Sequence, residues 1–244
     1  DHVGVDVVTV KKGDLVVSPF VWSDNSCDFC HEGLHTSCRH GGNWNAKGVG
    51  GCQAEAVRVP QADGTLVRLP VAADSALLPS LLTLSDVLCT GHHCAATAGV
   101  EAGSTVTVIG DGAVGLSAVL AAKRLGAEQI ILMGRHTGRT SLGREFGATD
   151  IVAERGDEGI ARIMEMTKGV GADSVLECVG MAESMQQAMG VCRPGGTVGY
   201  VGVPHGVSFD GQQLFFSQHR MLGGPAPVRR WLPDLMQRVL DGRI

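Results

Sequence analysis

The sequence lacks both an excess of positive charge and any long apolar run. It has 20 Lys and Arg residues against 25 Asp and Glu residues, so its net charge is −5. A nucleic-acid-binding surface needs a clustered basic excess, and a membrane-spanning helix needs about 20 consecutive, mostly apolar residues. We therefore expect neither nucleic acid nor a membrane among the partners of this chain.

Aromatic side chains are also scarce, at 4% of the 244 residues, whereas glycine is abundant, with 35 copies. That glycine content is about twice the average for globular proteins. Apolar residues make up 44% of the chain, which is enough to bury a core and argues against a disordered chain. These features favour an α/β protein with many tight turns, and the length favours two domains.

The chain also lacks the dense cysteines of a small secreted protein. Of its eight cysteines, three lie between positions 27 and 38 and the others are scattered. This spacing fits metal-binding cysteines in a reducing compartment better than a disulfide framework, so we expect a cytoplasmic protein. The sequence begins at Asp1 without a methionine, already inside a strand-like segment, and stops just after an apparent helix. We therefore expect a fragment of a longer protein.

Two regions differ in their residue patterns. Up to residue 88, short strand-like segments are broken by turns, at 3–8, 15–17, 54–60 and 65–70, and a stripe of leucines within 72–88 is helical in spacing. This pattern predicts a small β-rich domain over residues 1–88.

Beyond residue 103, apolar strands alternate with helices. Strands are expected at 106–109, 129–133, 150–152, 174–178 and 197–201, with helices at 113–125, 139–146, 156–167 and 182–192. Such alternation indicates parallel βαβ units and predicts a doubly wound parallel sheet over residues 89–226. Residues 227–244 carry apolar positions at helical spacing, which predicts an amphipathic helix.

A glycine motif follows the first of these strands and opens a helix. It reads Gly110-Asp111-Gly112-Ala113-Val114-Gly115. In this setting the first glycine permits a turn, the second lets the backbone approach a pyrophosphate, and the third allows close packing of helix and strand. The N–H groups of Ala113 and Val114 would face the phosphates. We predict a dinucleotide site here; the alternative is a glycine turn without a ligand.

The choice of nicotinamide cofactor depends on the end of the second strand, where sites for NAD carry an acidic residue. This sequence has Gly134 there, followed by Arg135 and His136, with Arg139 close by. A carboxylate would repel the 2′-phosphate of NADP, whereas arginine can bind it. We predict NADP(H) in preference to NAD(H), unless these arginines are only solvated surface charges.

A loop in the first region, the cysteine lobe (residues 24–40), carries potential metal ligands. Cys27 and Cys30 are three residues apart and Cys38 follows, which suits a structural Zn²⁺ site with a fourth ligand. Asp24 lies three residues before Cys27, and His31, His35 and His40 compete for the same role. A redox pair or three thiols without a ligand remain the alternatives.

Together these pieces resemble the zinc-containing medium-chain alcohol dehydrogenases, over nearly the whole sequence. The segments that carry the resemblance are 10–20, the cysteine lobe, 84–92, the glycine motif and Gly202-Val203-Pro204. The family has cysteine where this chain has Asp24. The resemblance implies an incomplete GroES-like catalytic domain, a Rossmann domain, and a terminal helix that returns to the first domain.

The resemblance also implies a catalytic zinc, with Asp86 as one ligand and the other two upstream of Asp1. It places Thr90, Val201 and Val203 at the nicotinamide. Zinc would stabilise an alkoxide while hydride passes between an alcohol, aldehyde or ketone and the cofactor. For Asp86, a helix cap is the alternative. We expect a homodimer or homotetramer, and little activity from this piece alone.

Two other functions fit part of this pattern. One is a zinc-free, NADPH-dependent double-bond or quinone reductase of the same superfamily, which the cysteine lobe and Asp86 disfavour. The other is a non-catalytic NADP(H)-binding sensor, which would keep the glycine motif and Arg135 but show no turnover.

Overall fold

The structure is a computed structural model that describes residues 2–44, 46 and 50–244. It divides into two compact units. One runs to Cys89 and includes Pro227–Ile244, and the other is Thr90–Ala226. Among the described residues, no helix combines the length and the apolar character that crossing a membrane requires.

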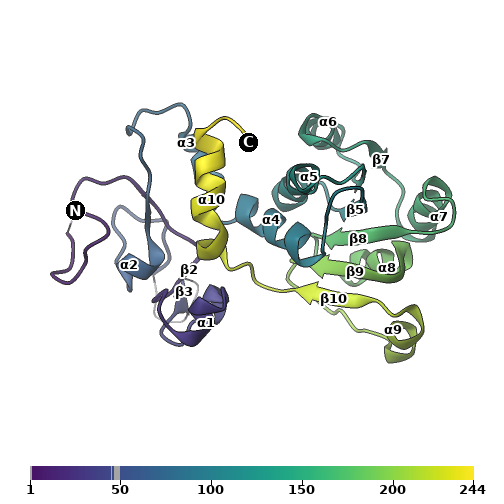
Figure 1. Ribbon diagram of the computed structural model, residues 1–244, viewed down its shortest axis with the longest axis horizontal. Coiled ribbons are helices and arrows are strands. Elements are labelled where there is room, and N and C mark those ends of the chain that lie inside the picture. The colour runs from purple at the N-terminus through teal and green to yellow at the C-terminus, as the bar shows by residue number, and fades with distance from the viewer. Residues whose placement is uncertain (1, 45, 47–49) are drawn as a thin grey trace. The chain divides into compact units, whose positions relative to one another are not determined.

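The second unit is built on a six-stranded parallel sheet with the order β10-β9-β8-β5-β6-β7 (Figure 1). In chain order this is the 3-2-1-4-5-6 arrangement of a doubly wound nucleotide-binding fold. The strands are β5 (Thr105–Ile109), β6 (Gln129–Met133), β7 (Asp150–Val152), β8 (Ala172–Glu177), β9 (Cys192–Tyr200) and β10 (Arg220–Gly223). The predicted fold class is confirmed.

Helices cover both faces of this sheet, because its strands are apolar on both sides. On one face, Val106, Val108 and Leu132 pack with α4 (Val87–Thr97) and α5 (Ala113–Leu125). On the other face, Ile131 and Val175 pack with α7 (Gly156–Met166) and α8 (Ala182–Val191). The remaining helices of this unit are α6 (Thr137–Phe146) and α9 (Gly211–Ser217).

Helix α5 shows how local sequence sets an element. It begins after Gly112, whose backbone is extended, and ends at Gly126, whose φ of 96° is left-handed. Glycine adopts that conformation without steric cost, so it is the usual residue just past a helix end. The predicted bounds of this helix are confirmed.

Other predicted elements of this unit differ in part from the structure. Strand β9 begins at Cys192, five residues before the predicted start at 197. Helix α9 and strand β10 were not predicted. Strand β10 is mostly exposed and has only Met221 and Leu222 as apolar residues, so its apolar run is too short to be recognised as a buried strand.

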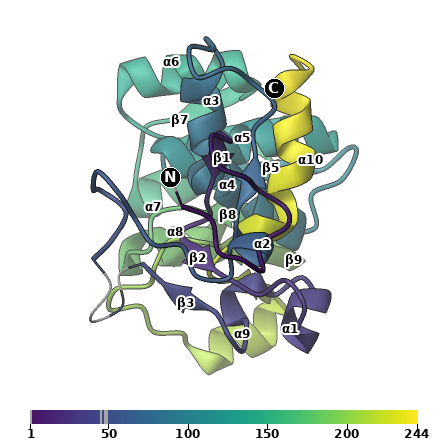
Figure 2. The ribbon, with the colours of Figure 1, turned by 90° about the vertical axis from the view of Figure 1, so that its left-hand side faces the viewer.

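The first unit contains short elements joined by long loops (Figure 2). Strand β1 (Val16–Val17) pairs with β4 (Val67–Arg68), and β2 (Val21–Trp22) pairs with β3 (Gly42–Asn43). The helices are α1 (Asp28–His31), η1 (His35–Ser37), α2 (Ala62–Thr65), α3 (Leu78–Leu82), η2 (Thr83–Ser85) and α10 (Val228–Leu240). The helical pattern predicted within 72–88 is thus divided among α3, η2 and the start of α4.

Two strands predicted in this unit, at 3–8 and 54–60, are loops in the structure. The backbone N–H of Val8 donates to the Asp63 carboxylate at 3.1 Å rather than to a neighbouring strand, and Val5 is fully exposed. Residues with high β propensity do not form a strand unless a neighbouring strand pairs with them and one face of the strand packs against other residues.

Helix α10 packs against α3 and η2 within this unit (Figure 2). It buries Val228, Leu232, Leu235 and Val239 on one side, as the amphipathic spacing predicts. Helix formation continues through Pro233.

Candidate cofactor and zinc sites

The glycine motif forms a tight turn between β5 and α5. Gly110 has φ of +109°, and a Cβ built on Gly115 would lie 1.8 Å from the carbonyl oxygen of Gly110. Any side chain at residue 115 would therefore collide with the backbone of the turn. A Cβ on Gly112 would meet nothing within 4 Å. Gly112 thus faces open space, where a close backbone approach by a phosphate is sterically possible.

The N-terminus of α5 follows this turn directly. The first intrahelical bond runs from the N–H of Leu116 to the carbonyl of Gly112, at 2.9 Å. The N–H groups before Leu116, including those of Ala113 and Val114, have no earlier carbonyl within the helix to donate to. With the helix dipole, they make this end of α5 suitable for an anion.

A cavity of about 110 Å³ lies beside the turn, at the carboxyl ends of the parallel strands. Pairing of Ile109 with Met133 and with Glu177 aligns these strand ends, and ligands of such sheets bind at this edge. The cavity is lined by Ile109, Gly110, Asp111, Met133, Gly134, Ala153, Glu154, Arg155, Val179, Met181, Glu183, Ser184 and Gln187.

Asp111 contacts two of the three basic residues that were predicted to select the cofactor, His136 and Arg139. The backbone N–H of His136 donates to Asp111 Oδ2 at 2.9 Å, and His136 Nδ1 lies 2.9 Å from the same oxygen. Arg139 Nη1 is 3.9 Å from Asp111 Oδ1. Burial acts to raise the pKa of Asp111, but the hydrogen bonds from His136 outweigh it and lower the pKa below its ordinary value.

This contact corrects one premise of the sequence analysis. Glycine at position 134 indicated that no carboxylate stands at the end of the second strand, but the Asp111 side chain lies against Gly134. The structure brings Gly134, His136 and Arg139 together around Asp111, and leaves the Arg135 side chain exposed.

Val201 and Val203 lie on a loop held to the end of β8. The N–H of Val201 donates to the carbonyl of Glu177 at 3.0 Å. A Cβ on Gly180 would lie 2.3 Å from the carbonyl oxygen of Val203, so the two loops are in backbone contact. Glu177 is fully buried, and its Oε1 accepts the N–H groups of Val179 and Gly180 at 2.9 and 2.8 Å.

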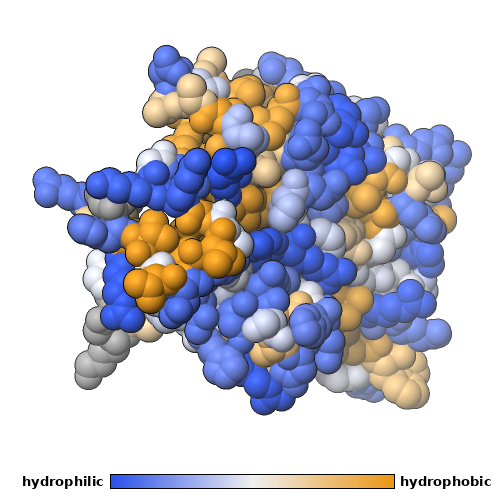
Figure 3. Space-filling view, turned by 60° about the vertical axis from the view of Figure 1, so that its left-hand side comes forward, coloured by the Kyte–Doolittle hydropathy of each residue, from blue (hydrophilic) through white to orange (hydrophobic). Residues whose placement is uncertain are grey.

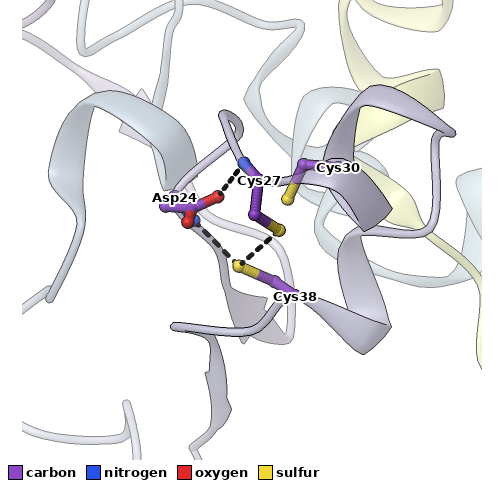
Figure 4. Close-up of side chains that lie close together, drawn as sticks. All are labelled: Asp24, Cys27, Cys30 and Cys38. Atoms are coloured by element: carbon purple, nitrogen blue, oxygen red, sulfur yellow. Dashed lines mark hydrogen bonds between the residues drawn. The ribbon is translucent and has the colours of Figure 1, made fainter.

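The cysteine lobe gathers four potential metal ligands. One ligand atom from each of Asp24, Cys27, Cys30 and Cys38 lies within 4.8 Å of the others. Their side chains point toward one another (Figure 4). Cys30 comes from α1 and Cys38 follows η1, so two short helical turns deliver thiols to the Asp24 loop.

This donor set fits Zn²⁺. A tetrahedral site with Zn–S bonds of about 2.3 Å places two sulfurs about 3.8 Å apart, and Cys27 Sγ lies 3.9 Å from Cys38 Sγ. Burial, followed by the neighbouring thiols and Asp24, raises the pKa of Cys30. Thiolates crowded beside a carboxylate need a cation to stabilise their charge, and zinc would supply it.

The three histidines considered as alternatives to Asp24 for the fourth ligand lie outside the group of four ligand atoms. His40 Nδ1 lies 2.5 Å from Asp24 Oδ2, so His40 contacts the candidate ligand itself. His35 Nε2 lies 2.8 Å from Asn25 Oδ1, and His31 is exposed. Asp24 is the fourth member of the group that the structure assembles.

Two known family profiles match this chain. The profile of the alcohol dehydrogenase GroES-like domain matches residues 1–71, and that of the zinc-binding dehydrogenases matches residues 113–240. This chain belongs to the zinc-containing medium-chain alcohol dehydrogenase family. The resemblance inferred from the sequence is confirmed.

Several members of this family are similar over almost the whole chain. The zinc-type alcohol dehydrogenase B of Aspergillus flavus is 32% identical over 243 residues, covering 96% of this chain and 56% of that protein. The NADP-dependent isopropanol dehydrogenase of Thermoanaerobacter brockii is 35% identical over 246 residues, covering 99% and 64%. A solved alcohol dehydrogenase from Thermus sp. ATN1 has a TM-score of 0.87 at 30% identity, covering 100% of this chain and 71% of that one. The chain thus spans 56% and 64% of the two relatives compared by sequence.

For the catalytic zinc site that the resemblance implies, only Asp86 and Thr90 were predicted within this chain. Asp86 is exposed, directly precedes α4, and lines an apolar cavity of about 830 Å³ in the first unit. Apolar side chains are exposed over this unit (Figure 3). Among the described residues, Asp86 joins no group of three potential metal ligands. The described residues therefore do not by themselves form a catalytic zinc site. Thr90 is buried in α4.

Sequence reasoning missed two acidic residues of this dehydrogenase fold. Asp111 is a variable position within the glycine motif, and Glu177 ends an apolar strand. A charged residue at the carboxyl end of a buried parallel strand is a usable signal, because such residues face the ligand-binding edge. Their partners could be known only from the folded chain.

Proposed function

We propose that this chain is part of an alcohol dehydrogenase that transfers hydride between an alcohol and its aldehyde or ketone, with NADP(H) as the preferred cofactor. The observation that carries the proposal is the glycine turn, with its open position at Gly112 and the free end of α5, beside a basic segment. The NADP-dependent relative from Thermoanaerobacter brockii supports the cofactor preference.

Each part of the proposed cofactor site has a defined task in the chain. The N–H groups of Ala113 and Val114 bind the pyrophosphate, and Arg135 and Arg139 bind the 2′-phosphate of the adenosine ribose. Val201 and Val203 lie beside the nicotinamide, on the loop that contacts Gly180. The cofactor itself supplies the hydride chemistry.

Two zinc sites belong to this proposal. The donor set of the cysteine lobe fits a structural Zn²⁺, which would hold residues 24–40 together. We also propose Asp86 as one ligand of a catalytic zinc, with Thr90 close to the reacting groups. That site needs ligands beyond those that the structure describes, so we expect this chain alone to bind cofactor and to show little turnover.

Cofactor preference is the sharpest test of this proposal. Kd for NADPH and for NADH can be measured on the purified chain by fluorescence of the reduced nicotinamide. Arg135→Asp should raise Kd for NADPH by about 10- to 100-fold, because it removes a charged hydrogen bond and adds a like charge, while NADH binding is maintained or improved. Arg162→Asp, an exposed change on α7, is the control. Tighter binding of NADH than of NADPH by the unaltered chain would refute the preference.

A further inference from the structure

The Asp111 side chain occupies the space that a side chain at position 134 would fill. A Cβ built on Gly134 would lie 2.5 Å from Asp111 Cβ and 2.9 Å from Asp111 Oδ2. Residue 134 follows β6 directly, at the position whose acidic side chain binds the ribose 2′-OH in sites for NAD. A carboxylate is therefore present at this place, although it comes from the glycine turn.

The surroundings of this carboxylate leave it able to accept another hydrogen bond. The Asp111 side chain is 9% exposed and lines the cavity beside the turn. Its partners are the N–H and Nδ1 of His136, with Arg139 Nη1 at a longer 3.9 Å. A carboxylate offers about four acceptor positions. The side chains of His136 and Arg139 are about half exposed, at 52% and 56%, so they can rearrange when a nucleotide binds.

The same carboxylate acts differently on the two cofactors. Toward NAD(H), it is an acceptor for the ribose 2′-OH. Toward NADP(H), its negative charge opposes the 2′-phosphate, and it competes with that phosphate for His136 and Arg139.

We propose that Asp111 is a specificity-determining residue that limits the preference for NADP(H) and allows the chain to hold NAD(H) as well. This inference rests on the proposed cofactor site. It departs from the usual reading of such sites, because the residue that discriminates lies within the glycine motif and not at the end of the second strand.

Asp111→Asn tests the inference, because the amide keeps the size of the side chain and can still accept the N–H of His136. NADPH should bind about 5- to 10-fold tighter to this variant, since a like charge is removed. NADH should bind about 3- to 5-fold weaker, since a neutral amide is a poorer acceptor than a carboxylate. Kd values come from fluorescence titration of the purified chain, and thermal melting checks that the variant is folded. Asp111→Ser gives the same test if the amide variant does not fold.

Glu145→Gln is the matched control, because Glu145 is an exposed carboxylate on α6 that does not line the cavity. An equal shift in this variant would show a general charge effect and overturn the role of Asp111. Unchanged Kd values in Asp111→Asn, or equal weakening of both cofactors, would also overturn it. Weaker binding of NADPH alone would show instead that Asp111 only positions His136 and Arg139. The unaltered chain tests the proposed function separately: if it binds neither cofactor, both proposals fail.

Discussion

Asp24→Asn is expected to weaken zinc binding by the cysteine lobe by about 100-fold. Zinc contributes about 10–16 kcal/mol in small structural sites with four ligands, so one ligand accounts for about 3 kcal/mol, which corresponds to about 100-fold in Kd. The substitution should remove the ligand charge and leave the local backbone hydrogen bonds in place. Asp24 Oδ1 accepts the N–H groups of Ser26 and Cys27 at 2.9 and 3.0 Å, and the asparagine oxygen can keep both bonds.

The assay is competition for zinc with a chromophoric chelator, with metal content measured by mass spectrometry. Asp24→Cys should bind one zinc at least as tightly as the unaltered chain, because it supplies a fourth thiolate. Asp28→Asn is the matched control: it removes the same charge from the same lobe, but the Asp28 carboxylate pairs with Arg39 and is not one of the four grouped residues. Unchanged zinc affinity in Asp24→Asn, or an equal loss in Asp28→Asn, would refute the assignment of Asp24 as a ligand.

Five further substitutions, at three places in the fold, have clear expected outcomes. Gly115→Ala should lower the thermal stability, because its Cβ would lie 1.8 Å from the Gly110 carbonyl oxygen, whereas Gly112→Ala should leave the melting temperature unchanged and weaken cofactor binding; the opposite pattern would contradict the roles given to these glycines. Glu177→Ala should cost about 2–4 kcal/mol in chemical denaturation, because two backbone N–H groups lose their acceptor, and Glu177→Gln should cost less. Leu235→Ala should cost about 2–5 kcal/mol, because that side chain is fully buried in the first unit; a cost below 1 kcal/mol, on the order of a surface substitution, would contradict its place in the core.

Some elements of this fold follow from local sequence, and others depend on distant partners. Strands such as β6 and helices such as α5 were predicted with their observed bounds, because apolar periodicity and flanking glycines act within a few residues. In the first unit, the segment 54–60 has the composition of a strand but forms a loop. Whether such a segment becomes a strand depends on a partner far along the chain.

The sequence by itself determined the fold class, the family and the place of the glycine turn, since each depends on residues that are close along the chain. The tertiary structure alone decided which side chains meet across these segments. It brings Cys38 to Cys27 and Asp24, and it places the Asp111 carboxylate against Gly134, 23 positions away along the chain. The physical reason is that hydrogen bonds and charge interactions act over a few ångströms in space, and only the folded chain brings these side chains that close together.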